Sequence, residues 1–189
     1  PGQNYRIKVI YNPTPAYGWA TQLGGTSAET GNSIAVTEDE LRVYVAGWYD
    51  GPSKFGDQVV NNVDGNVDGF VTELDGDGKV VKTTLLTGNG NNDEKMIGAL
   101  VDKDGFVYVA GHFESQAASY GSIGLNLQGP NDTKNVFVIK LAPTGNQMNS
   151  AQIGGSSTQR SAVEITDFGI EYNAAGLPRL TVVGRYQKF

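Results

Sequence analysis

Cysteine is absent from this chain of 189 residues, and His112 is its one histidine. The lack of cysteine excludes disulfides, thiol catalysis and cysteine-ligated metals. It leaves the compartment open, because a β core of this size does not need disulfides. No apolar run approaches the roughly 20 residues that a membrane-spanning helix needs, so we expect no membrane span.

Basic residues are the minority among the charges, with 14 Lys and Arg against 20 Asp and Glu and a net charge of -6. Nucleic-acid binding needs a basic face that releases counterions from phosphates, so no nucleic-acid partner is expected. The opening residues Pro1–Asn4 carry no signal-peptide pattern. Either the mature chain starts there or it is a segment of a longer one.

Catalytic constellations are also missing from the sequence. There is no Gly-x-Ser-x-Gly nucleophile elbow that would complement His112. The spacing of the carboxylates brings no two of them together as a glycosidase pair would require. We therefore predict that the chain is not an enzyme, with no catalytic residues and an unknown ligand.

Glycine is abundant, with 26 residues, and some of it belongs to an internal repeat. Val43–Gly47 recurs unchanged as Val107–Gly111, a spacing of 64 residues from Gly47 to Gly111, and Leu180–Gly184 is a weaker third copy. The third copy is seven residues longer than the others before its last glycine, and we place the insertion at Asn173–Pro178. A repeat of this length is typical of solenoids and propellers.

A second repeated segment follows each of the first two copies. Phe70–Leu74 matches Phe137–Leu141, and Ile7–Tyr11 fits the same pattern at the same distance from a following glycine. Apolar residues alternate in these segments with the period of a β-strand. Asp75–Gly78 and Asp102–Gly105 have the composition of hairpin turns, and no stretch has helical periodicity. The sequence thus predicts an all-β fold.

Four strands per repeat of roughly 65 residues predict a β-propeller made of four-stranded antiparallel blades. We expect one segment over residues 1–189 with about three blade equivalents, at about 18–80, 81–146 and 147–189, the last completed by strand 6–12. Propellers typically close with four to eight blades. The expected partners are therefore further blades from the same or another polypeptide, in an oligomer or polymer.

The order of Trp19–Gly25, Val43–Gly47 and Asp68–Gly78 resembles the SBBP class of β-propeller repeats. In that family a Gly-Gly turn, a Val-Tyr-Val-Ala-Gly strand and an Asp-x-Phe-Val-x-Lys-Leu strand recur in each blade. The resemblance covers about Ile7 to Phe189 and departs from the family at Ala162–Phe168. It implies a propeller in a secreted or cell-surface protein and assigns no activity.

One loop has the composition of a calcium site. Asp64, Asn66 and Asp68 alternate as in the first half of a calcium-binding loop, and Asp75 stands at the twelfth position. Calcium binds six to eight hard oxygens, which such a cluster supplies. The alternative is an acidic loop that leads into a strand, with Asp75 as a turn residue.

Two further features bear on location and binding. Asn131 begins an Asn-Asp-Thr sequon in a polar loop, which would carry a glycan in a secreted eukaryotic protein. Aromatic residues at strand ends either pack between blades or stack on sugar rings; they are Trp19, Trp48, Tyr49, Phe113 and Tyr186.

Taken together, these features predict a non-enzymatic, extracellular structural protein that mediates protein-protein packing in a filament, sheath or appendage. The alternative is a surface module that binds carbohydrate or protein through its loop aromatics. Calcium is the one cofactor that the sequence suggests.

Overall fold

The computed structural model describes residues 18–62, 66–90, 92–129, 133–154 and 161–188. The predicted strand 6–12, Asp64 and Asn131 lie outside these residues. The described part is built of strands and turns, which confirms the all-β prediction for it, and it holds no helix long and apolar enough to span a membrane. The strands are β1 (Leu23–Gly25), β2 (Glu29–Val36), β3 (Arg42–Tyr49), β4 (Ser53–Phe55), β5 (Gln58–Val60), β6 (Asp68–Asp75), β7 (Val80–Gly88), β8 (Glu94–Val101), β9 (Val107–Phe113), β10 (Ala117–Tyr120), β11 (Ile123–Asn126), β12 (Asn135–Leu141), β13 (Gln147–Ile153), β14 (Ser161–Tyr172) and β15 (Pro178–Lys188).

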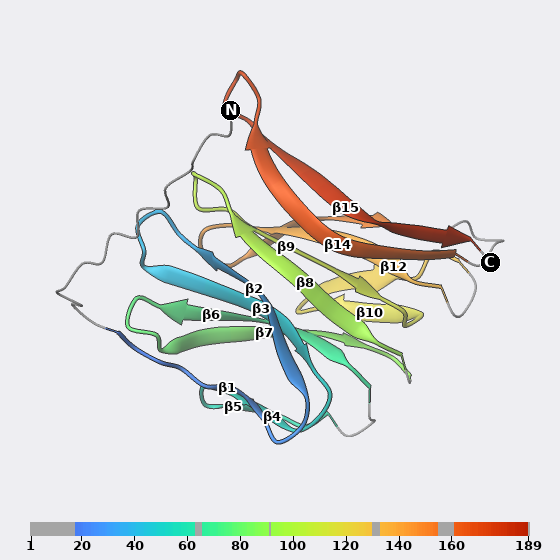
Figure 1. Cartoon of the computed structure of the whole chain (residues 1–189), viewed down its shortest axis with the longest axis horizontal. Helices are drawn as coiled ribbons and strands as arrows, with labels where there is room; N and C mark the ends of the chain where they lie inside the picture. The colour runs from blue at the N-terminus through green and yellow to red at the C-terminus, as the bar shows by residue number, and fades with distance from the viewer. Residues whose placement is uncertain (1–17, 63–65, 91, 130–132, 155–160, 189) are drawn as a thin grey trace, which may run out of the picture.

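Hydrogen bonding divides these strands into four antiparallel sheets (Figure 1). The first sheet has the six-stranded order β11-β10-β7-β6-β3-β2, and the second sheet has the four-stranded order β13-β12-β9-β8. The third sheet has two strands, β14 and β15. The fourth sheet has the three-stranded order β1-β4-β5. The described strands do not close into a ring.

The sequence repeat is visible as a repeat of strand order. Strands β2, β3, β6 and β7 follow one another across the first sheet, and β8, β9, β12 and β13 do the same across the second. The third sheet contains counterparts of only the first two strands. The predicted repeat units are offset from the observed sheets by one strand. The unit predicted at 81–146 begins at β7, which the structure places in the first sheet, and the unit predicted at 147–189 begins at β13, which it places in the second.

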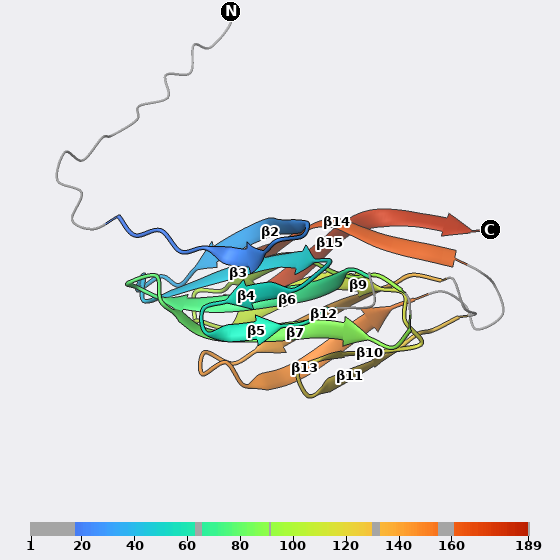
Figure 2. The same ribbon diagram turned by 90° about the horizontal axis from the view of Figure 1, so that it is seen from below.

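The three main sheets pack face to face in chain order, as their two buried clusters show. In Figure 2 the first sheet lies nearest to the viewer. One core lies between the first and second sheets and includes Tyr44 and Val71 from the first sheet with Ile139 from the second. Another lies between the second and third sheets, where Tyr108 packs near Phe168. Each large apolar side chain buried in this way contributes about 1.5–3 kcal/mol.

The glycine of the Val-Ala-Gly repeat is required by a β-bulge that recurs in all three sheets. The register shifts opposite Gly47, Gly111 and Gly184. A Cβ on Gly111 would lie 2.2 Å from the carbonyl oxygen of Lys95 and 2.9 Å from the ring of Phe137. Gly47 and Gly184 face the equivalent carbonyl oxygens at 2.0 and 2.2 Å. The bulge leaves no room for a side chain, which explains why glycine recurs.

Asp75 and its counterparts close the hairpin turns. Oδ1 of Asp75 accepts hydrogen bonds from the backbone N of Asp77 (3.1 Å) and of Lys79 (2.9 Å). Asp102 and Asn173 accept the same two bonds in their own turns. The side chain thus replaces backbone partners at the tip of each hairpin, which confirms the predicted turns.

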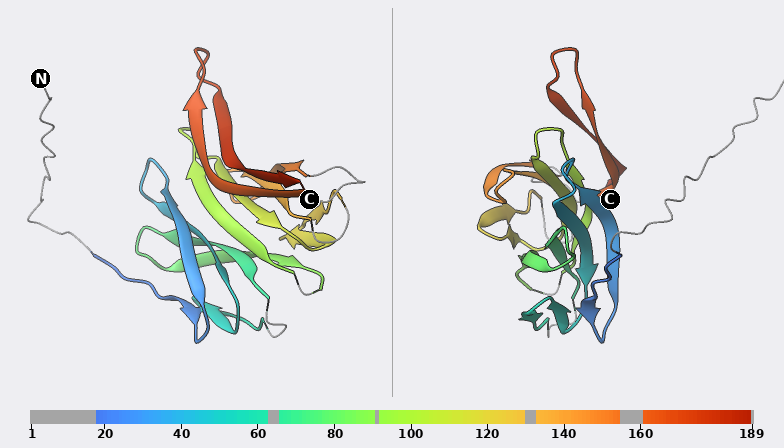
Figure 3. Two further views of the ribbon diagram at one scale, coloured as in Figure 1. Left: turned by 45° about the vertical axis from the view of Figure 1, so that its right-hand side comes forward. Right: turned by 90° about the vertical axis from the view of Figure 1, so that its left-hand side faces the viewer.

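The predicted insertion at Asn173–Pro178 is wrong in its placement. The turn from Asn173 to Leu177 closes with the same backbone bonds as the turn from Asp102 to Phe106. Four of the seven extra residues instead lengthen the strands, since β14 and β15 continue for two further pairs, ending at Tyr172 opposite Pro178. The other three lie between Gly154 and Ile165, before the bulge. The tip of the third sheet therefore projects beyond the other sheets (Figure 3).

Two short hairpins connect neighbouring sheets rather than extending their own. The β10–β11 hairpin lies in the chain between two strands of the second sheet, yet β10 pairs with β7 of the first. The β4–β5 hairpin has the same position in the repeat and pairs with β1, with Leu23 opposite Phe55 as Leu86 is opposite Tyr120. Residues 23–25 therefore occupy the position of an outer strand in a preceding sheet.

Candidate assembly surfaces

The predicted calcium ligands do not come together in the structure. Asp68 and Asp75 are the two ends of β6, about 23 Å apart at the rise of a β-strand, so one ion cannot take both. Nδ2 of Asn62 donates to the backbone oxygen of Asn66 (2.8 Å) and to Oδ2 of Asp68 (3.3 Å), which ties this loop together. The described residues hold no group of three or more His, Asp or Glu suited to a metal. Of the four predicted ligands, Asp68 and Asp75 therefore cannot share one ion, and Asp64 lies outside the described residues.

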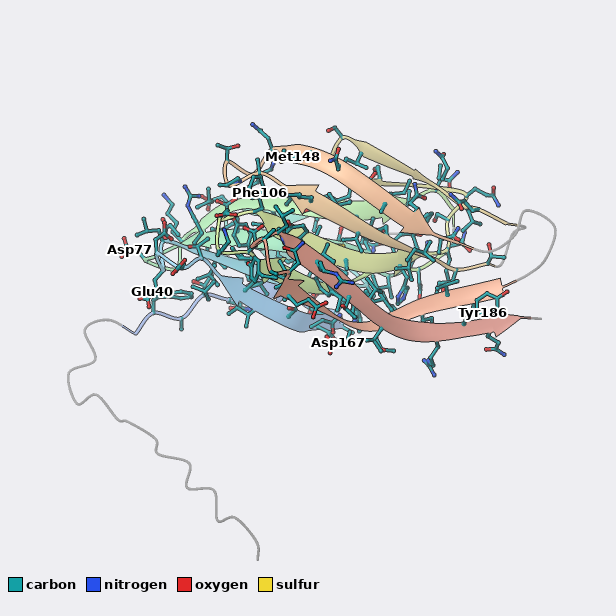
Figure 4. All side chains as sticks on the ribbon, turned by 90° about the horizontal axis from the view of Figure 1, so that it is seen from above. Glu40, Asp77, Phe106, Met148, Asp167 and Tyr186 are labelled. Carbon is teal, nitrogen blue, oxygen red and sulfur yellow. The ribbon has the colours of Figure 1, made fainter. Side chains whose placement is uncertain are left out.

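The third sheet exposes an aromatic position that the other two sheets bury. Tyr49 and Phe113 each lie two residues after the repeat glycine and are 2% and 0% exposed, whereas Tyr186 in the same position is 64% exposed. The ring of Tyr49 lies 6.5 Å from that of Phe70, and the Phe113 ring lies 6.2 Å from that of Phe137. Both partners come from a third strand, which the described third sheet lacks. Figure 4 shows Tyr186 at the margin of the molecule.

The outward faces of the stack expose two further repeat positions. Val183 is 54% exposed on the third sheet, although its counterparts Ala46 and Ala110 are fully buried between sheets. Ile34 is 66% exposed on the first sheet. Its counterparts, Ala99 and Phe168, are 1% and 7% exposed because each packs against the preceding sheet. Each end of the stack thus exposes an apolar position that the internal interfaces cover, although Val183 lies opposite Asp167.

A groove of about 370 Å³ lies on the outward face of the first sheet, beside Ile34. The segment that leads to β1 forms one wall, where Nε1 of Trp19 donates to the backbone oxygen of Gly76 (3.0 Å) and Thr21 donates to that of Gly78. Apolar side chains of β3 and β6 line much of the groove. This bond holds Trp19 beside the turn at Gly76, where the residue is 43% exposed.

The third sheet is joined to the second by an ionic cluster around Lys134. Nζ of Lys134 lies 2.9 Å from Glu114 and 2.7 Å from Glu164, which also binds Arg185 at 2.7 Å. Burial opposes the charge of Lys134, but the two carboxylates outweigh it and raise the pKa of the ammonium. Lys134, followed by Arg185, lowers the pKa of Glu164. The backbone N of Val163 also donates to the oxygen of Lys134 (3.0 Å), so the hairpin is fixed in place.

Two buried titratable groups lie in the second sheet. Desolvation raises the pKa of Glu94 to about 7, although its Oε1 accepts a bond from the backbone N of Ser115 (3.1 Å). Desolvation, followed by the charge of Lys134, lowers the pKa of His112 to about 4. Glu94 lies opposite Phe113 and His112 opposite Lys95, in successive strand pairs, so the two side chains point to opposite faces. They do not form an acid-base pair.

Comparison with models of known protein families finds no match, and comparison with curated protein sequences finds none either.

Sequence reasoning did not identify Ile34 or Val183 as functional positions, and it offered Tyr186 only as one of the aromatics at strand ends. The signal was present, because each stands at a repeat position whose counterparts are apolar. Whether these side chains are exposed depends on which face of each sheet another sheet covers, and a repeat in a single sequence does not specify this.

Proposed function

We propose that this chain is a structural assembly protein, a sector of β-propeller blades that extends by packing its end sheets against further blades. The observation that carries the proposal is the exposure of Ile34 and Val183 at repeat positions that internal interfaces bury. An apolar residue that is exposed at a position where its counterparts are buried between sheets is a candidate contact for a further sheet. Because the two end faces differ, their contact is head-to-tail, and it yields a ring or a filament depending on the rotation per subunit.

The propeller assignment has two supports. Three sheets stack face to face around their first strands, and the hairpin of β10 and β11, inserted in the second sheet, links that sheet to the first. The resemblance to SBBP repeats favours the same architecture and a secreted or cell-surface location. On this proposal the first, second and third sheets are two blades and the first half of another.

The mass of the native particle in solution tests the proposal. Light scattering coupled to size-exclusion chromatography is expected to give a multiple of the 20.1 kDa chain. Val183→Asp places a charge on the end face and is expected to reduce the particle to the monomer. Val59→Asp is the matched control, since Val59 is 63% exposed on β5, the edge strand of the sheet of β1, β4 and β5, and lies on neither the first nor the third sheet. A native monomer at all concentrations would contradict the proposal.

The alternative is a surface module that binds carbohydrate or protein. The groove beside Trp19 is the observation that favours it, because an aromatic wall suits a sugar ring. A glycan array probed with the native protein separates the two functions. Micromolar sugar binding by a stable monomer would support the alternative, and multimers without sugar binding support assembly.

A further inference from the structure

Strand β7 of the first sheet has an outer edge that β10 covers at one end. β10 pairs with Leu86–Gly88, and the backbone N of Gly121 donates to the oxygen of Leu85 (3.3 Å). Among the described residues, no strand pairs with the rest of this edge, Val80–Thr84, which is called the β7 edge below. An unpaired strand edge presents backbone donors and acceptors to another extended chain.

The β7 edge lies along a groove of about 690 Å³. Side chains of β5, β7, β10, the β10–β11 turn and the β12–β13 turn line this groove. Most of them carry hydroxyl or amide groups, namely Gln58, Thr83, Thr84, Thr87, Ser119, Ser122 and Asn146. Val81 on the edge itself is 50% exposed, so the edge is open to solvent.

The pairing with β10 shows which backbone groups of the β7 edge face the groove. Asn89 donates its backbone N–H to the oxygen of Ala117 (3.0 Å), and Leu85 accepts its bond from Gly121 on the same side. Every second residue of an antiparallel strand turns its N–H and C=O to the same side. The N–H and C=O of Thr83 therefore face the groove, and those of its two neighbours face β6.

We infer that the β7 edge at Lys82–Thr84 binds an extended segment of a partner polypeptide by β-strand addition, in line with β10. This binding is a function beyond assembly through the end sheets. Its length matches the additions within the chain, since β4 pairs with β1 over three residues and β10 with β7 over three. The bulge at Val81, between the pairs formed by Lys82 and Val80, ends the addition.

The space beside Thr84 requires a small side chain in the partner. Lys82 and Thr84 also line a second cavity of about 20 Å³, together with Tyr44 and Tyr120. A cavity of this size holds about one water molecule. The partner residue opposite Thr84 points to the same face as Thr84, so we expect alanine, serine or glycine there.

The charge of Lys82 favours an acidic residue in the partner. Glu73 lies opposite Lys82 on β6, but its carboxylate is bound to Arg42. Lys82 forms no ion pair with a described residue. Opposite charges on facing residues of neighbouring strands attract, so a carboxylate fits opposite Lys82. A partner that runs antiparallel to β7, as β10 does, therefore has a small residue, any residue that favours a strand, and an acidic residue in that order.

Binding of the fluorescently labelled peptide Ser-Val-Asp-Val-Thr, measured by anisotropy, tests the inference. Its first three residues have the order that the β7 edge requires. N-methylation of the first valine removes the donor to the oxygen of Thr83 and is expected to weaken binding about tenfold or more. N-methylation of the aspartate is the matched control, because the N–H of that residue points away from β7.

Two measurements on the protein locate the site. Lys82→Gln is expected to weaken peptide binding about threefold, whereas Lys79→Gln, in the neighbouring turn and outside the groove, leaves it unchanged. Amide hydrogen exchange at Thr83 is expected to slow in the complex, because its N–H gains a partner.

No binding of the peptide at millimolar concentration, or an equal loss from the two N-methylated peptides, would overturn the inference. Peptide binding without slower exchange at Thr83 would place the peptide elsewhere and overturn it as well. The mass of the native particle is measured without peptide, so these outcomes leave the assembly function to its own test.

Discussion

At the scale of single residues, the close approach at the bulge explains the strongest feature of the sequence. Gly47, Gly111 and Gly184 each face a carbonyl oxygen of the neighbouring strand at a distance that excludes Cβ. In the first two sheets the ring of Phe70 or Phe137 also covers the glycine. Glycine and phenylalanine therefore recur together because one makes room for the other.

Gly111→Ala is expected to lower the free energy of unfolding by about 1–3 kcal/mol, the usual cost of overpacking a buried site. The added methyl would meet the oxygen of Lys95, which belongs to backbone and moves only with β8. Urea denaturation measures the loss. Gly124→Ala is the control, because nothing lies within 4 Å of a Cβ there. Equal effects at the two positions would refute the close-approach argument.

Glu94 gives the protein a pH dependence of stability. Its pKa is about 7 in the folded chain because of desolvation, above the 4.5 of an ordinary glutamate. The folded state therefore holds this proton more tightly, and the contribution of Glu94 to stability falls as the pH rises from about 4.5 through 7. A shift of this size corresponds to about 3 kcal/mol.

Glu94→Gln is expected to match the parent near pH 4.5 and to exceed its stability at pH 8, since the amide stays neutral. Its carbonyl oxygen can accept the bond from the backbone N of Ser115. Urea denaturation across this pH range gives the comparison. The difference between variant and parent isolates Glu94, because His112, whose pKa is lowered to about 4, stabilises the fold as the pH rises over the same range in both proteins. A variant that gains no stability over the parent between pH 4.5 and 8 would show that Glu94 ionises without penalty.

At the scale of elements, the inserted hairpins are structural connectors rather than loose loops. Leu125 on β11 is fully buried in the core between the first two sheets, and β10 extends the first sheet through β7. The β10–β11 hairpin lies in the chain between two strands of the second sheet, and it thus stabilises the first sheet. This arrangement links the second sheet to the first.

Leu125→Ala is expected to cost about 2–5 kcal/mol, the range for a buried leucine that leaves a cavity. The matched control is Val59→Ala on the equivalent outer strand β5, where the side chain is exposed and the loss should stay within about 0.5 kcal/mol. Thermal denaturation of both variants gives the comparison. Similar small losses in both would mean that the β10–β11 hairpin does not support the core.

At the scale of the whole molecule, the two end faces differ and assembly through them has a direction. Ile34→Asp blocks the face of the first sheet and Val183→Asp blocks the face of the third. Each variant alone should be monomeric, because every contact needs one face of each kind. An equimolar mixture retains one intact pair of faces and should form dimers and nothing larger, as measured by light scattering. Larger particles in the mixture would contradict head-to-tail packing.

The all-β class, the turns at Asp75 and Asp102, and the repeat were predictable from sequence, because alternation, turn chemistry and a recurring motif are local properties. The sequence grouped Asp75 with Asp68 as calcium ligands, although the two residues are at opposite ends of β6, because composition does not distinguish a continuous loop from a loop followed by a strand. The extra residues of the third copy were misplaced because longer paired strands and a longer turn have the same effect on spacing.

The sequence by itself determined the strands, their turns and the glycine at each bulge, since these depend on neighbours in the chain and on a motif repeated along it. The tertiary structure alone decided which apolar positions are covered. Ile34, Val183 and Tyr186 have counterparts that are buried, yet they are exposed because their burial depends on a neighbouring sheet or strand rather than on their own segment.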